Sequence, residues 1–179
     1  MQLIAIITFL LFNRQPVHQP NTTHVKKDTI SIDTTRYAIL QFNKSRDTFI
    51  FDKNSKRANL SGEDLKKIEK IISVSVTEYN HQLDQGKKLR AKQKDTKPSI
   101  QFATGTAINK PGKYYKQLIP IINPKGEKEV WVNCFCTPHE KRYWRKGVVM
   151  ILDGGPCFFN LKINLATNTV MAFSVNGVS

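Results

Sequence analysis

The stretch from Leu60 to Gly86 constrains the fold most, because it carries a full set of signals for one amphipathic helix. Ser61 is a good N-cap, and Asp64 resembles the acidic residue of a capping box. Leu60 and Leu65 stand at the two positions of a hydrophobic staple, and Gly86 is a plausible C-terminal stop. Apolar residues recur at helical spacing on one stripe: Leu65, Ile68, Ile72, Val76, Tyr79 and Leu83, with Ile71 on its flank. Such a stripe needs an apolar partner, and the face of a β-sheet is the natural one.

The second half of the chain predicts that sheet. Segments 114–122 and 129–136 are strand-like and flank a strong turn signal, Asn-Pro-Lys-Gly, at 123–126. Pro120 lies inside the first segment and has no N–H to donate to a strand ladder. We therefore expect this strand to lie at a sheet edge or to be bulged at Pro120.

The strand pattern continues to the C-terminus. Segment 148–152 is a short buried-strand candidate, and Asp-Gly-Gly-Pro at 153–156 then reverses the chain. Segment 157–165 alternates between two faces: Cys157, Phe159, Leu161, Ile163 and Leu165 on one, and Phe158, Asn160, Lys162 and Asn164 on the other. Met171, Phe173 and Val175 continue the apolar face. The order predicts an α+β fold, in which one long helix packs on a curled antiparallel sheet and is followed by a β-meander.

The N-terminal part predicts export. Ten apolar residues at 3–12 have the length of a signal-peptide core and are too few to span a bilayer as a helix. Neither a basic residue before them nor a small-residue cleavage site after them completes the signal, so a buried strand or core helix is the alternative. We expect a signal-peptide-like segment at 1–12, which associates transiently with a membrane, and a polar linker at 13–35. A single α+β domain follows at 36–179, where 36–42 and 48–51 are expected to form a hairpin.

The chain is strongly basic, with 28 Lys and Arg against 14 Asp and Glu, for a formal charge of +14. Such a charge favours anionic partners such as nucleic acid, lipid head groups or acidic polysaccharide, or it serves only as a solvated surface. Part of the excess lies at 87–97, which has no aromatic residue for base stacking and is interpreted first as a solvated linker.

Three cysteines leave several interpretations open. A disulfide is expected in an oxidising compartment, but a meander with a strand at 148–152 would place Cys136 and Cys157 at opposite ends of the sheet. Buried thiols, with Cys134 among them, are the simpler alternative. With the three cysteines, His139 would complete a set of four candidate zinc ligands. His139 could also act as the base that activates Cys136 for nucleophilic catalysis. The spacing is typical of neither, so we expect no metal, no small-molecule cofactor and no catalytic residue.

The segment 137–147 is the best candidate for a contact surface. It interleaves aromatic and basic residues, a combination enriched in interface anchors and suited to anionic polymers. The candidate binding residues are Lys141, Arg142, Tyr143, Trp144, Arg145 and Lys146. In the alternative interpretation, the Trp and Tyr fold back onto the sheet.

Two resemblances add to these patterns. The strand–helix–meander order is similar to the cystatin-like arrangement, although the inhibitory Q-x-V-x-G motif of cystatins is missing. The sequence W-V-N-C-F-C at 131–136, with G-G-P-C-F-F-N-L-K-I-N-L at 154–165, resembles a family of small exported bacterial proteins of unknown function. This second resemblance covers residues 112–179 and implies an exported α+β domain without assigning an activity.

The sequence therefore predicts an exported, non-enzymatic domain that binds a partner or supports an envelope assembly. It is expected in the periplasm, in the cell envelope or outside the cell. Two alternatives remain: a binder of acidic polysaccharide or nucleic acid through the basic aromatic segment, and a cysteine-dependent hydrolase.

Overall fold

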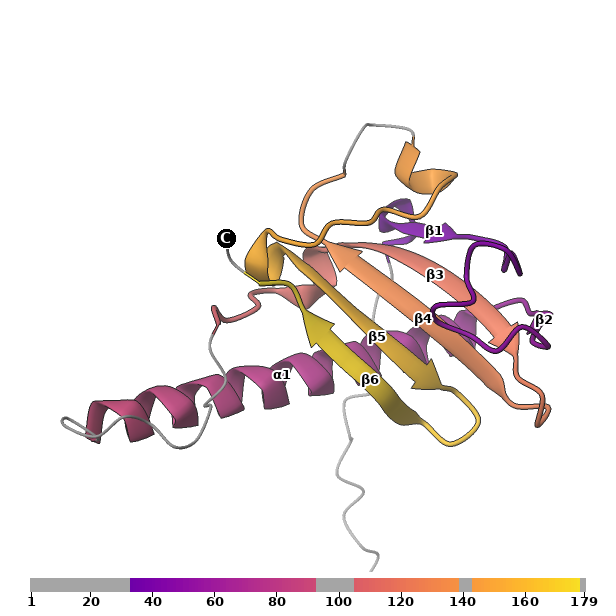
Figure 1. Cartoon of the computed structure of the whole chain (residues 1–179). Coiled ribbons are helices and arrows are strands. Elements are labelled where there is room, and N and C mark those ends of the chain that lie inside the picture. Colours follow the sequence, from indigo (N-terminus) through magenta and orange to yellow (C-terminus); the bar gives the residue numbers. More distant parts are fainter. Residues whose placement is uncertain (1–32, 93–104, 139–142, 178–179) are drawn as a thin grey trace, which may run out of the picture.

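The computed structural model describes residues 33–92, 105–138 and 143–177. One long helix lies across one face of a six-stranded open sheet, and its C-terminal part extends beyond the sheet (Figure 1). The elements are η1 (Thr34–Arg36), β1 (Tyr37–Ile39), β2 (Lys56–Arg57), α1 (Gly62–Lys92), η2 (Pro111–Lys113), β3 (Tyr115–Ile122), β4 (Lys128–Phe135), η3 (Tyr143–Arg145), η4 (Gly155–Cys157), β5 (Phe158–Asn164) and β6 (Thr169–Val175). The predicted α+β fold, with a helix before an antiparallel meander, is confirmed.

The sheet has the order β1-β3-β4-β5-β6, and β2 pairs with the end of β3 beyond β1. Every pairing is antiparallel except that of β1 with β3, which is parallel. Parallel neighbours need a long crossover, and here the connection from β1 to β3 contains α1. The crossover places α1 across the sheet, so that its apolar stripe can be buried there.

The start of α1 follows the predicted capping signals. The Asp64 N–H donates to Ser61 Oγ at 3.1 Å, and the Ser61 N–H donates to Asp64 Oδ2 at 2.9 Å. Leu60 and Leu65, the two residues of the predicted hydrophobic staple, are both partly buried against the core beneath the helix. The predicted end is wrong, because the helix passes through Gly86 and continues to Lys92. A glycine lowers helix propensity by only about 1 kcal/mol, so it does not by itself end a helix.

The turn between β3 and β4 is as predicted, but the expectation that β3 is an edge strand or is bulged at Pro120 is wrong. β3 has neighbours on both sides and runs in continuous register with β4 past Pro120. On the side of β3 away from β4, the Leu118 carbonyl accepts a bond from the Leu40 N–H, and the Pro120 carbonyl accepts one from the Ala58 N–H. The N–H and C=O of one residue point to the same side of a strand. The position of the missing N–H of Pro120 therefore faces the gap between β1 and β2. Proline is tolerated there because no described strand pairs with β3 at that residue on this side.

The predicted hairpin of 36–42 with 48–51 is wrong. β1 pairs with β3, and residues 43–51 form turns around the buried Asp47 carboxylate, which accepts a bond of 2.8 Å from the Asn43 N–H. Phe42 and Phe51 pack edge to face, with ring centroids 5.9 Å apart. The apolar residues that suggested two paired strands are buried by this packing instead.

Two cores lie on opposite faces of the sheet. On the helix face, α1 covers a core that includes Tyr37, Ile68, Ile72, Val76, Leu118, Val130, Val132, Cys134, Phe159, Leu161 and Ile163. On the outer face, irregular segments cover a second core of Ala38, Leu40, Phe42, Phe51, Ile119, Ile121, Trp131, Phe135, Trp144, Val149 and Phe158. The terms helix face and outer face are used for these two sides below.

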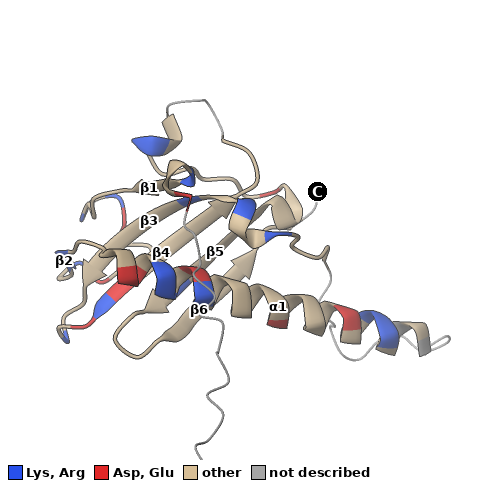
Figure 2. Ribbon diagram, turned by 180° about the vertical axis from the view of Figure 1, so that it is seen from behind, with Lys and Arg blue, Asp and Glu red and all other residues tan. Residues whose placement is uncertain are grey.

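Several predictions concern residues outside the described part of the chain. These are the signal-peptide-like segment at 1–12, most of the linker at 13–35, and the end of the basic run at 87–97. Both signs of charge occur along the described length of α1 (Figure 2). Among the described residues, no helix has the length and apolarity needed to cross a membrane.

Candidate binding site on the outer face

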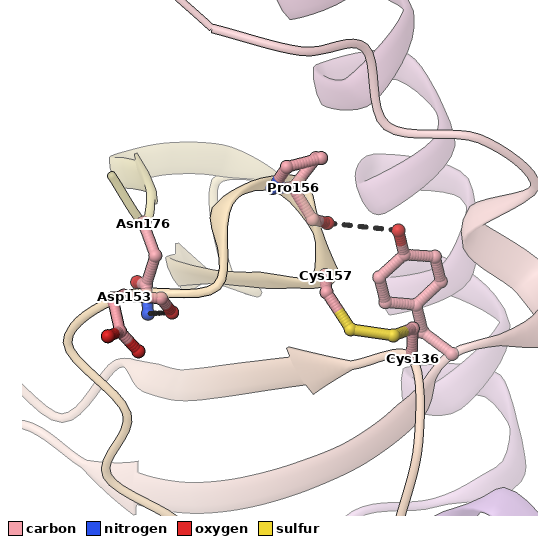
Figure 3. Close-up of a disulfide and its surroundings, with 6 residues drawn as sticks. Cys136, Asp153, Pro156, Cys157 and Asn176 are labelled. Atoms are coloured by element: carbon pink, nitrogen blue, oxygen red, sulfur yellow. Dashed lines mark hydrogen bonds between the residues drawn. A yellow bond between two sulfur atoms is a disulfide. The ribbon is translucent and has the colours of Figure 1, made fainter. Parts of the chain in front are cut away.

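A disulfide joins Cys136, just after β4, to Cys157, just before β5 (Figure 3). Their Cα atoms are 5.0 Å apart, and the Cys136 N–H donates to the Cys157 carbonyl at 3.0 Å. The expectation that these residues lie at opposite ends of the sheet is wrong, because 148–152 is not a strand. β4 and β5 are therefore direct neighbours, and the end of one meets the start of the other.

The disulfide closes the segment 137–156, which we call the outer loop. Further bonds hold its C-terminal end: the Tyr114 hydroxyl donates to the Pro156 carbonyl at 2.9 Å, and the Asn176 amide donates to the Asp153 carbonyl at 3.0 Å (Figure 3). The same Asn176 amide also donates to the Ile151 carbonyl at 2.5 Å. The loop is thus tied at one end to β4, β5 and β6.

Two buried amides of the sheet hold the middle of the outer loop. The Gln117 side chain donates to the Trp144 and Gly147 carbonyls, at 2.5 and 2.6 Å, and accepts from the Val149 N–H at 2.9 Å. The Asn133 amide donates to the Val149 carbonyl at 2.8 Å. The backbone of Val149 therefore pairs with side chains rather than with a neighbouring strand, which explains how this apolar segment is buried without strand structure.

The structure separates the predicted binding residues. Trp144 is buried against Tyr115 and Phe135, as the alternative interpretation expected. The Arg145 guanidinium stacks on the Trp144 ring at 4.3 Å and donates to the Tyr37 carbonyl at 3.1 Å. Both residues therefore fix the loop in place.

Tyr143 and Lys146 remain exposed at the surface. The remaining two candidates, Lys141 and Arg142, lie outside the described residues. Arg145 is exposed as well, but its guanidinium stacks on Trp144 and bonds the Tyr37 carbonyl. Apart from Arg145, the described candidate residues offer one exposed aromatic ring and one exposed ammonium group.

A groove of about 470 Å³ opens beside this loop, over β4, β5 and β6. We call it the outer-face groove. Its floor carries the outward side chains of three strands: Trp131, Asn133, Asn160, Lys162, Ala172 and Ser174. Its walls come from 49–50 and 149–152, where Phe49, Met150 and Leu152 are strongly exposed. A second hollow shares Phe49 and Met150 and adds Arg46, Tyr143 and Lys146.

The charged groups near the groove are largely paired. Lys162 Nζ lies 3.1 Å from Glu129 Oε2 and 5.1 Å from the centroid of the Phe51 ring. The Arg46 side chain bonds the buried Asp47 carboxylate, and this hydrogen bond raises the pKa of the guanidinium above its ordinary value. No ionic partner of Lys146 is present among the described residues. The site therefore combines apolar and amide side chains, with a small positive excess.

A second polar cluster lies inside the helix-face core. Lys116 is buried, and its Nζ is 3.1 Å from Glu69 Oε1, which also accepts a bond from the Tyr37 hydroxyl. Burial raises the pKa of the neighbouring Cys134 thiol to about 12, although Lys116 opposes the shift. Such a thiol is protonated at neutral pH and is a poor nucleophile.

Two further hypotheses concern the cysteines: a nucleophile at Cys136 and a zinc site. Cys136 is bonded to Cys157 and so carries no thiol, while His139, the proposed base, lies outside the described residues. Within residues 33–92, 105–138 and 143–177, no group of three or more His, Cys, Asp or Glu is arranged to hold a metal ion.

The sequence pattern missed most of the groove but contained part of its signal. The alternation of 157–165 predicts that Asn160 and Lys162 lie on the face opposite the core, and in the structure both lie in the floor of the outer-face groove. The rim residues carry no such signal, because Phe49 lies in a predicted hairpin strand and Met150 and Leu152 lie in a predicted buried strand. Comparisons with protein-family models, curated proteins and solved structures find no match for this chain.

Proposed function

We propose that the chain is an exported, non-enzymatic domain that holds a partner protein against the outer-face groove. The observation that carries the proposal is the rim. Phe49, Met150 and Leu152 are 58%, 60% and 91% exposed, yet all three border one hollow. Grouped apolar side chains around a concave surface are typical of interaction sites, whereas single exposed ones are ordinary.

The construction of the rim supports binding. Met150 and Leu152 follow Val149, whose backbone is fixed by Gln117 and Asn133. Because the disulfide closes the same loop, the rim is ordered before a partner arrives. Ordering in advance lowers the entropic cost of association and so favours affinity.

The disulfide also supports the export hypothesis. Disulfides persist in oxidising compartments and are rare in the reducing cytosol. Together with the apolar segment 3–12, the Cys136–Cys157 bond favours a location in the periplasm, in the envelope or outside the cell.

Binding of an anionic polymer stays a prediction with less support. The predicted stacking residue Trp144 is buried, and Arg145 is engaged with the Tyr37 carbonyl. Tyr143, Arg145 and Lys146 are the exposed residues among the described binding candidates.

Photo-cross-linking in the producing cells tests the proposal. A photoreactive phenylalanine analogue replaces Phe49, Met150 or Leu152 in separate variants, and Thr77 on α1 serves as an exposed control. We expect the same discrete adduct from the groove positions, recovered with the envelope or secreted fraction, and none from Thr77. Equal patterns from all four positions, or no adduct from any groove position, would contradict the proposal.

A further inference from the structure

The strand β6 forms an edge of the sheet and is paired on one side alone within the described chain. The Asn176 N–H donates to the Phe158 carbonyl at 3.0 Å, so this residue faces β5. Backbone groups alternate between the two sides of a strand, and so the N–H and C=O of Phe173 and Val175 point away from β5. No described residue bonds them. These groups can pair with the backbone of an additional strand.

Hollows flank this edge on both faces of the sheet. On the outer face, Ala172, Ser174 and Asn176 line the outer-face groove. On the helix face, another hollow of about 470 Å³ lies between α1 and the start of β6, and we call it the helix-face hollow. It is lined by Lys67, Lys70, Ile71, Val74, Ser75, Asn168 and Val170. An added strand directs successive side chains to opposite faces, so an edge with a hollow on each side suits it.

The chemistry of the two hollows differs. On the helix face, the exposed side chains of Val74 and Val170 offer an apolar surface. On the outer face, the Asn160 and Ser174 side chains are opposite each other and have no hydrogen-bond partner in the described chain. The outer-face groove also has the apolar rim of Phe49, Met150 and Leu152, which fits apolar side chains of a partner.

Charge selects among the possible occupants. Lys67 and Lys70 border the helix-face hollow, no carboxylate lines it, and neither lysine has an ionic partner among the described residues. A second copy itself carries a net charge of +14. Like charges at such an edge oppose self-association, whereas carboxylates are attracted to it.

We propose that β6 accepts an extended, acidic segment of a partner protein as an added strand, with carboxylates towards Lys67 and Lys70 on the helix face and apolar side chains towards the outer-face groove. The inference rests on the proposed function, because the groove forms one of the two flanks. It adds the conformation and the charge of the partner.

Synthetic peptides test the strand directly. The probe is a short peptide in which valine and glutamate alternate, and its binding to the full chain is measured by calorimetry. We expect it to bind, and the matching valine–lysine peptide not to bind. Two further peptides are N-methylated, one at all valine amides and the other at all glutamate amides. Because only alternate amides face β6, one of these peptides should bind about tenfold or more weakly, and the other should bind as the unmodified peptide does.

Variants of the chain provide the second test. Val175→Pro removes an N–H that points away from β5 and should abolish binding of the peptide, whereas Val175→Ala should retain it. Val74→Asp places a carboxylate in the hollow that Lys67 and Lys70 border, where it repels the carboxylates of the peptide and should also abolish binding, while the matched change Thr77→Asp should not. Circular dichroism and a thermal melt check that each variant is folded.

The outcomes separate this inference from the proposed function. Failure of the valine–glutamate peptide to bind, equal loss with both methylation patterns, or binding unaffected by Val74→Asp would overturn the added strand. A wild-type dimer that Val175→Pro dissociates would identify a second copy as the occupant and would overturn it as well. Cellular cross-links from Met150 that persist in Val175→Pro would leave the groove as a binding site and remove β6 from it.

Discussion

The two faces of the sheet are covered in different ways. On the helix face, the single regular element α1 buries a continuous apolar stripe, including Ile68, Ile72 and Val76. On the outer face, the cover consists of loops and short turns, and buried amides of Gln117 and Asn133 hold the loop backbone. A helix satisfies its own backbone bonds, whereas an irregular segment needs partners from the surface that it covers. The outer face therefore needs polar residues inside its core.

This difference also determines where a binding site can form. α1 covers the middle strands of the sheet with a straight apolar surface, and hollows lie along its flanks, one of them beside β6. The outer loop ends before it reaches the whole of β5 and β6, and the uncovered part is the outer-face groove. Regular packing stabilises one side of the sheet, and incomplete, rigid packing on the other side creates a concave surface.

The largest effect is expected from Lys116, which is buried on the helix face. Replacing Lys116 by alanine leaves Glu69 without its cation in a nearly closed core, and breaking such a pair costs about 3–5 kcal/mol. We expect the free energy of unfolding in guanidinium chloride to fall by that amount. As a matched control, Lys66→Ala removes the exposed pair with Glu63 and should cost less than about 1 kcal/mol. Equal losses in the two variants would mean that the buried pair is not structurally important.

The next effect concerns the disulfide of the outer loop. Changing Cys136 and Cys157 to serine together removes a link across a sequence separation of 21 residues, which should cost about 3 kcal/mol. Hydrogen exchange should accelerate first at Val149 and Trp144, while amides of α1 near Ile72 keep their protection. Uniform acceleration in both regions would contradict the separation of the two faces.

Gln117→Leu tests the polar attachment of the outer loop. The change leaves the Val149 N–H and the Trp144 carbonyl without their partner, and unsatisfied buried groups cost about 1–3 kcal/mol. We expect a smaller loss of global stability than in the Lys116 variant, together with loss of the cross-link from Met150. Gln82→Leu, which removes an exposed bond to Glu78 on α1, is the control and should change neither measurement.

The sequence predicted the helix face well, because each of its signals is local. The capping residues Ser61 and Asp64 and the apolar stripe act within a few turns of one helix. The β3–β4 turn and the alternation of β5 are local in the same sense.

The outer face could not be predicted in this way. Segment 148–152 has the composition of a buried strand, and it is indeed partly buried at Val149. Its backbone partners, Gln117 and Asn133, come from distant strands, and no local pattern identifies them. That one error separated β4 from β5 in the predicted order, and it thereby hid both the disulfide and the groove.

The smallest expected effect tests how far the helix face depends on local signals. The Asp64 carboxylate bonds the Ser61 N–H at 2.9 Å and Lys128 Nζ at 2.8 Å. Burial raises the pKa of this carboxyl, but the bonds from Lys128 and Ser61 outweigh burial and hold the pKa below its ordinary value of 3.8. Asp64→Asn should therefore lower the free energy of unfolding at neutral pH, by about 0.5 kcal/mol for a partly exposed pair.

The sign of this contribution follows from the direction of the pKa shift. A carboxyl with a lowered pKa in the folded state stabilises the protein at a pH above its unfolded value, and the stabilisation is lost as the pH falls through the folded value. The difference between wild type and Asp64→Asn should thus be constant near neutral pH and decline as the pH falls below about 3.8 through the lower pKa of the folded state. Asp84→Asn, an exposed change on the same helix, is the control in the same urea titrations. A difference that persists in acid would assign the stabilisation to the shape of the cap rather than to its charge.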